Sequence, residues 1–153
     1  MKCISTSATL LLLLSVAGCG GAPMATTSPS PTPAPSPTPA RDSMNSITNM
    51  NPAVGTALQP GQTVTFAGTA GYTLATADLG TVVMVLQDQS DRLLPISGAQ
   101  QTVVAHRGTA DVTLVQTATI PSDGVTSVRV YFALTAAGST STSAVLMVSY
   151  PVR

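Results

Sequence analysis

The sequence of 153 residues contains very little charge. Charged residues make up 8% of the chain, whereas about 25% is typical of soluble domains. Glutamate is absent, the only lysine is Lys2, and the net charge is zero. Because a nucleic-acid-binding protein normally carries a basic stripe or a high pI, we expect no nucleic-acid partner.

Aromatic and metal-binding side chains are equally scarce. Tryptophan is absent, aromatic residues make up 3% of the chain, and His106 is the only histidine. The two cysteines are Cys3 and Cys19, both near the N-terminus. What remains is mainly Thr, Ser, Ala, Val, Gly and Pro, a mixture that favours strands and turns over helices.

The N-terminus begins with the positive pair Met1-Lys2, and the stretch from Thr9 to Ala17 is apolar apart from Ser15. This apolar stretch is too short for a membrane-spanning helix, which needs about 20 residues. It has the length of the apolar core of a signal peptide. We therefore expect a signal peptide over residues 1–18.

The next residues, Val16-Ala17-Gly18-Cys19, resemble the lipobox of bacterial lipoproteins. The resemblance implies cleavage before Cys19 and lipidation of its thiol with acyl chains such as palmitate, which anchor the protein to a membrane. Cys3 would be removed, so no disulfide or zinc-thiolate site is expected. Gly20, in place of aspartate, implies the outer membrane if the cell envelope has two membranes, with the protein facing the periplasm or the cell surface. The alternative is an ordinary secretory signal with a chance cysteine.

Residues 19–46 are interpreted as the lipidated cysteine followed by a linker rich in Pro, Ser and Thr. Proline occupies every second position from Pro29 to Pro39. Because proline fixes φ and lacks an N–H donor, this pattern favours extended polyproline II over helix or sheet. We expect a disordered spacer that holds the folded part away from the membrane. A ligand for a proline-recognising domain, or a glycosylated segment, is the alternative.

Residues 47–153 show the two-residue alternation of β-strands, with turn signals between the runs. Seven strands are predicted, and no segment has helical periodicity. Seven such strands bury their apolar faces best as two packed sheets. The pattern resembles immunoglobulin-like and fibronectin type III-like domains, which implies an all-β, two-sheet antiparallel sandwich. The cysteine pair and core tryptophan of antibody domains are absent, and a small β-barrel or jelly roll is the alternative.

Alternation also predicts which side chains form the core. One face of the predicted strands carries Phe66, Leu114, Val130, Phe132 and Leu146. Arg129 has the opposite parity and is expected to face solvent. Met84 and Met147 are interpreted as side chains that fill the core or its margin.

Candidate catalytic and ligand-binding residues are few. His106 precedes an expected turn at Arg107-Gly108, so a Ser-His-Asp site with Asp111 is not expected. Asp88 and Asp91 are interpreted as turn residues rather than Ca²⁺ ligands. We expect no enzyme activity, no cofactor and no metal, and Tyr131 is the best candidate for an exposed ring that contacts a ligand.

The sequence therefore predicts a non-enzymatic envelope lipoprotein that presents one β-sandwich. Its expected partners are the membrane, through the lipid at Cys19, and an envelope protein. Its expected role is protein–protein interaction or a structural role at the cell surface. The alternative is a module that binds a glycan or cell-wall polymer.

Overall fold

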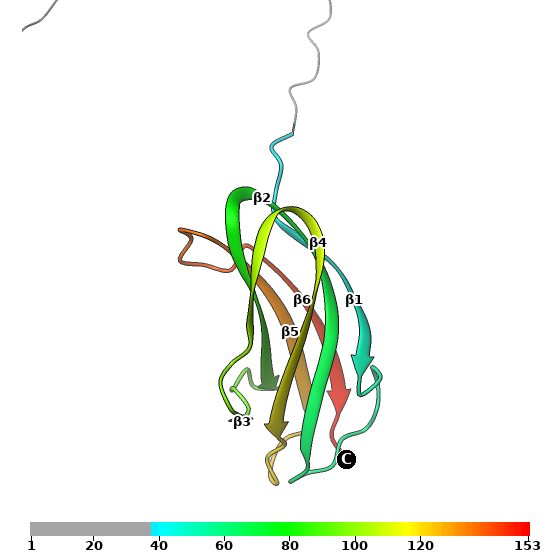
Figure 1. Cartoon of the computed structure of the whole chain (residues 1–153). Helices are drawn as coiled ribbons and strands as arrows, with labels where there is room; N and C mark the ends of the chain where they lie inside the picture. The colour runs from blue at the N-terminus through cyan, green and yellow to red at the C-terminus, as the bar shows by residue number, and fades with distance from the viewer. Residues whose placement is uncertain (1–37) are drawn as a thin grey trace, which may run out of the picture. The chain divides into compact units, whose positions relative to one another are not determined.

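The computed structural model describes residues 38–153, and all regular structure in that range is β (Figure 1). The expected signal peptide, Cys19 and most of the linker lie outside the described residues. The strands are β1 (Ser43–Asn51), β2 (Thr63–Asp88), β3 (Ile96–Ser97), β4 (Thr102–Thr119), β5 (Ser127–Ala136) and β6 (Ala144–Pro151). The expected all-β class is confirmed.

The six strands form one antiparallel sheet in the order β3-β4-β2-β5-β6, and β1 pairs with β2. The first part of β2, residues 63–74, pairs with β1 and with residues 108–119 of β4. The second part, residues 80–88, pairs with β5, and the register of β2 against β4 shifts between Leu74 and Leu79. β4 continues beside both halves of β2, since residues 79–83 of β2 pair with residues 102–106 of β4, whereas β1 pairs only with the first half and β5 only with the second. Figure 1 shows that β2 and β4 both bend at the same end of the domain.

The structure has fewer and longer strands than the sequence predicted. The runs expected as separate strands on either side of residues 76–79 are joined in β2, and those on either side of Arg107-Gly108 are joined in β4. Neither junction contains a proline, so backbone pairing can continue through it. Gly108 adopts a φ of 109°, which lets β4 bend without a Cβ penalty. The expected turn at Arg107-Gly108 is therefore wrong.

Two further elements differ from the expectation. β1 begins at Ser43, four residues before the expected boundary of the folded part, in a stretch with little alternation. The segment around Leu93 contributes only an isolated bridge between Leu93 and Gln87, and the short strand β3 follows at Ile96.

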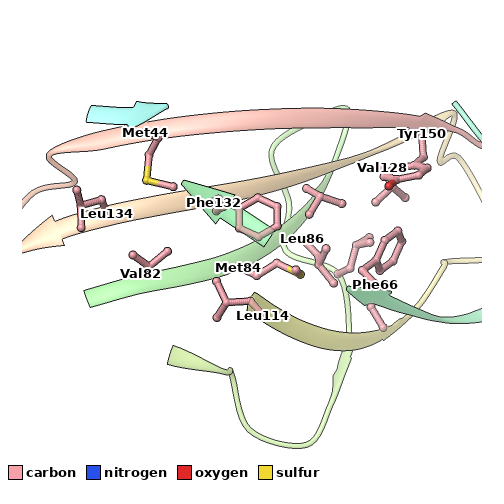
Figure 2. Packing of buried hydrophobic residues seen from close by; sticks show 14 of the residues in the cluster. Met44, Phe66, Val82, Met84, Leu86, Leu114, Val128, Phe132, Leu134 and Tyr150 are labelled. Atoms are coloured by element: carbon pink, nitrogen blue, oxygen red, sulfur yellow. The ribbon is translucent and has the colours of Figure 1, made fainter. Parts of the chain in front are cut away.

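Buried side chains from all the long strands form one core (Figure 2). β5 alternates without interruption between buried and half-buried residues. Of the five residues predicted for the core, four are fully buried, Phe66, Leu114, Val130 and Phe132, and Leu146 packs against them half-buried. The rings of Phe66 on β2 and Tyr150 on β6 meet edge to face with centroids 5.4 Å apart. This contact joins strands that are not hydrogen-bonded to each other.

Asp42, just before β1, secures the bend of β2. Its Oδ1 accepts the backbone N–H groups of Ala75 at 2.8 Å and Thr76 at 3.0 Å, and its Oδ2 accepts the Thr76 hydroxyl at 2.7 Å. Burial alone raises the pKa of Asp42, but these hydrogen bonds outweigh it and lower the pKa below 3.8. The carboxylate thus supplies acceptors where β2 changes direction.

The opposite end of the domain is closed by the segment between β1 and β2. The Tyr150 hydroxyl donates to the carbonyl of Pro52 at 2.7 Å. Leu58 forms a parallel bridge with Val152, in which its N–H donates to the Pro151 carbonyl at 2.9 Å. The C-terminal end of β6 is therefore covered by this segment.

Candidate functional site: an apolar outer face

The sheet presents two outer faces of different chemistry. On the face formed by β2 residues 63–73 and β4 residues 109–119, four cross-strand threonine pairs share hydrogen bonds with Oγ1–Oγ1 distances from 2.8 to 3.1 Å. We call this the hydroxyl face, and its residues are Thr63, Thr65, Thr69, Thr73, Thr109, Thr113, Thr117 and Thr119. Hydroxyl groups that satisfy one another and also contact water make a well-solvated surface.

The outer face of the second half of β2 with β5 and β6 is apolar. Its side chains lie in two adjacent rows across the three strands, because Val85 pairs with Tyr131 and Tyr131 with Met147, while Val83 pairs with Ala133 and Ala133 with Val145. We call this the apolar face, and its residues are Val83, Val85, Tyr131, Ala133, Val145 and Met147. Directly paired residues on one face are in contact range, so the six side chains form one patch.

The apolar face is open to solvent mainly along β6. Val145 is 52% exposed and Met147 is 47% exposed. The other four side chains are half-buried by their neighbours in the rows. An isolated exposed apolar side chain is common on protein surfaces, whereas a contiguous patch with a polar border is typical of an interaction site.

A polar row borders the apolar face on one side, and a mixed row borders it on the other. The row beyond Tyr131 consists of Gln87, Arg129 and Ser149. The row beyond Ala133 contains Thr81 and Thr135, and Thr81 pairs in turn with the exposed Val104 of β4. Arg129 Nη1 donates to Asp91 Oδ1 at 2.7 Å. Interaction with the Tyr131 hydroxyl, and then with Asp91, raises the pKa of the Arg129 guanidinium, although desolvation opposes it.

Tyr131, the residue predicted to contact a ligand, lies in the centre of its row between Val85 and Met147. Its side chain is half-buried, with its hydroxyl near Arg129. The ring is therefore part of the patch rather than an isolated stacking platform. Its role in ligand contact stays a prediction, as does the lipidation of Cys19, which lies outside the described residues.

The structure does not bring His106 together with Asp111. His106 is exposed and pairs with Leu79, and its backbone N–H donates to the buried Tyr72 hydroxyl at 3.0 Å. Asp111 pairs with Gly71 on the face of the threonine pairs. The histidine thus has a place in the strand ladder and no carboxylate partner among residues 38–153.

The two aspartates considered as Ca²⁺ ligands, Asp88 and Asp91, are engaged separately, as is Asp78. Asp78 pairs with Arg107 at 2.8 Å, and Asp91 pairs with Arg129. Asp88 is buried, and its Oδ1 accepts the Ser90 N–H at 2.7 Å and the Arg92 N–H at 3.1 Å. The interpretation of Asp88 as a turn residue is confirmed.

Within residues 38–153, no three His, Cys, Asp or Glu side chains lie close enough to hold a metal ion, and no pocket is present. The same part of the chain contains no helix long and apolar enough to cross a membrane. Neither the protein-family models nor the curated proteins that were searched match this sequence.

Sequence reasoning missed most of the apolar face. Met147 was expected in or near the core, and this is wrong because it points outward from β6. A signal was present in the consecutive apolar residues 82–86 and 144–148, where both faces of each strand are apolar. A run such as 82–86 is typical of a strand covered on both faces, whereas here the outer face is open.

Proposed function

We propose that the folded domain is an immunoglobulin-like sandwich in which the sheet folds over at the bends of β2 and β4. An immunoglobulin constant-type domain has strands in the orders ABED and CFG. The order β1, first half of β2, second half of β4, β3 corresponds to ABED. The order second half of β2, β5, β6 corresponds to CFG. The contact of Phe66 with Tyr150 supports packing of the two halves face to face.

The proposed function is that of a membrane-anchored, non-enzymatic envelope lipoprotein that presents this domain for interaction with another protein. The lipobox-like residues ending at Cys19 support the anchor, and the Pro-rich linker supports presentation at a distance from the membrane. The apolar face is the observation that carries the interaction role. A flat patch of adjacent apolar side chains with a polar row along one border matches the composition of protein–protein interfaces.

A second candidate function is the binding of a glycan or cell-wall polymer. It is favoured by Tyr131, whose ring lies beside the polar row of Arg129 and Gln87. An aromatic ring next to hydrogen-bonding side chains can stack on a sugar and orient its hydroxyl groups.

Photo-crosslinking from the apolar face separates these functions. A photoreactive amino acid replaces Met147 in the full chain, expressed in a bacterial envelope, and the crosslinked products are identified by mass spectrometry. Val115, 44% exposed on the other outer face, is the matched control position. We expect envelope proteins crosslinked from position 147 and not from position 115.

Polysaccharide crosslinked from position 147 would instead support the glycan function. Equal yields from both positions, or no product from position 147, contradict an interaction site on the apolar face. A product containing only this chain is not evidence for the proposed function.

A further inference from the structure

The methionines of residues 38–153 differ in how open their side chains are to solvent. Met84 is completely buried and Met44 is 8% exposed, whereas Met147 on β6 is 47% exposed. Met50 is half-buried and packs against the core. Its Sδ lies against Gly68 on the core side of β2. Within this part of the chain, Met147 is therefore the methionine that a solute reaches most easily.

Few other side chains of this range react readily with oxidants. Both cysteines lie near the N-terminus, outside it, and the chain has no tryptophan. Tyr72 and Tyr150 are buried, and Tyr131 is half-buried. Oxidation of a methionine thioether to the sulfoxide is a common result of oxidant exposure. An oxidant that reaches the domain thus meets Met147 as its most accessible sulfur.

Met147 occupies the open side of the apolar face, where a change of polarity has the greatest effect. It pairs with Tyr131, and Val145, the other strongly exposed side chain of the face, lies two residues before it. A thioether is apolar and polarizable, whereas a sulfoxide is polar. Covering that oxygen with a partner that gives it no hydrogen bond costs free energy. Because the side chain points away from the core, the fold itself is retained.

We propose that Met147 is an oxidation site for two-electron oxidants of the peroxide class, and that its sulfoxide form weakens binding to the apolar face. A lone pair of Sδ attacks one oxygen of hydrogen peroxide, and the S–O bond forms as the O–O bond breaks. The departing hydroxide takes the proton of the new S–OH group and leaves as water. Sulfur loses two electrons and the peroxide gains them. The oxidation site is independent of the proposed function, whereas the loss of binding rests on it.

Peptide mapping of the full chain after exposure to hydrogen peroxide tests the site. Trypsin cuts after arginine, so fragment 130–153 contains Met147 as its only methionine, and fragment 42–92 contains the other three of the described range. We expect fragment 130–153 to gain one oxygen at least several-fold faster than fragment 42–92. In urea that unfolds the domain, fragment 42–92 should react at least as fast. A rate for fragment 42–92 in the folded protein that equals or exceeds that of fragment 130–153 overturns the site.

Photo-crosslinking before and after oxidation tests the loss of binding. The photoreactive amino acid replaces Val145, and each chain is compared with itself in the absence of peroxide. We expect peroxide to lower the yield of crosslinked envelope protein several-fold when residue 147 is methionine. The yield of the Met147→Leu chain, which has no sulfur at this position, should not respond to peroxide.

An equal response of both chains, or no response of either, overturns the effect of Met147 oxidation on binding. Absence of crosslinked products without peroxide contradicts the proposed function and the loss of binding together. The peptide map still decides the oxidation site in that case, so the two failures are distinguishable.

Discussion

Phe132 lies at the centre of the domain, and its environment is closely packed. It is completely buried on β5, opposite Met84, and a Cβ added to Gly68 would lie 2.8 Å from Phe132 Cζ. We expect Phe132→Ala to lower the free energy of unfolding by about 3–5 kcal/mol, the range for a buried aromatic truncation. Because domains of this size have about 5–15 kcal/mol of stability, urea unfolding should show that the variant is only marginally stable.

Arg129→Ala is the matched control on the same strand. Its side chain is 31% exposed, and its ion-pair partner Asp91 is 70% exposed. Ion pairs of this kind contribute about 1 kcal/mol or less, so the urea midpoint should change little. A greater loss of stability for Arg129→Ala than for Phe132→Ala would contradict the observed inward and outward faces of β5.

Asp88 should make stability depend on acid pH. Burial raises its pKa, but hydrogen bonds from the N–H groups of Arg92 and Ser90, with the Arg92 guanidinium, outweigh burial and lower the pKa below 3.8. A lowered folded-state pKa contributes stability above about 3.8 that is lost as pH falls through the folded value. Unfolding free energies measured from pH 7 down to pH 2 should therefore fall less steeply for Asp88→Asn.

Asp42 also has a lowered pKa, so part of the acid slope remains in the Asp88→Asn variant. Asp78→Asn is the control, since the Asp78 side chain is 89% exposed. Its pH profile should follow that of the unsubstituted chain. A profile for Asp88→Asn that is as steep as this control would contradict the assigned role of Asp88.

Side-chain parity could be predicted from the sequence because it depends only on neighbouring residues. Phe66, Val130 and Phe132 were assigned to the core by alternation, and all three are fully buried. Alternation does not identify the buried face where both faces of a strand are apolar, as around Met147. There the sequence does not say which face is covered, because that depends on strands distant in the chain.

At the scale of elements, the bend of β2 depends on Asp42. Asp42→Ala removes three hydrogen bonds to Ala75 and Thr76. We expect the free energy of unfolding to fall by about 1–2 kcal/mol, because hydrogen bonds to a charged group each contribute more than neutral ones but this site is partly exposed. Denaturant unfolding checks this, with Arg41→Ala as the neighbouring exposed control. Equal midpoints for the two variants would count against the role of Asp42.

The same bend explains which elements could not be predicted. The apolar alternation stops at residues 76–79, which separates the expected strands, yet β2 continues through them to Asp88. β1 was not recognised because its polar sequence SMNSITNMN lacks a regular apolar face. It is a strand because β2 offers it a partner, and that partner is more than ten residues away in the chain.

At the scale of the whole molecule, the anchor is the feature to test first. Cys19→Ser removes the thiol that the lipobox resemblance implies is lipidated. We expect this variant to move from the detergent phase to the aqueous phase in a detergent partition assay, because acyl chains alone supply the membrane affinity. Cys3→Ser, within the expected signal peptide, should stay in the detergent phase. Retention of Cys19→Ser in the detergent phase would falsify the lipoprotein assignment.

The apolar face is assembled from three strands of the folded molecule, which is why the sequence predicted only one of its residues as a surface contact. Tyr131 was selected as a single aromatic ring of outward parity. Its neighbours Val85 and Met147 come from segments on either side in sequence and meet it only through the registers of two ladders. A single sequence does not determine those registers, so the patch becomes visible only in the fold.

The long pairing of β2 with β4 also predicts an order of folding events. The partners Thr63 and Thr119 are 56 residues apart in sequence, and Thr73 and Thr109 are 36 apart. The ladder ends at Val83 and Thr102, which are closer still. Because closing a shorter loop costs less entropy, we expect strand pairing to begin near Val83 and to extend towards Thr63. Two buried valines of β2 report on this order: Val82→Ala should give a φ-value above about 0.5 and Val64→Ala one below about 0.3. The reverse ranking in stopped-flow kinetics would mean that the domain nucleates at its far end.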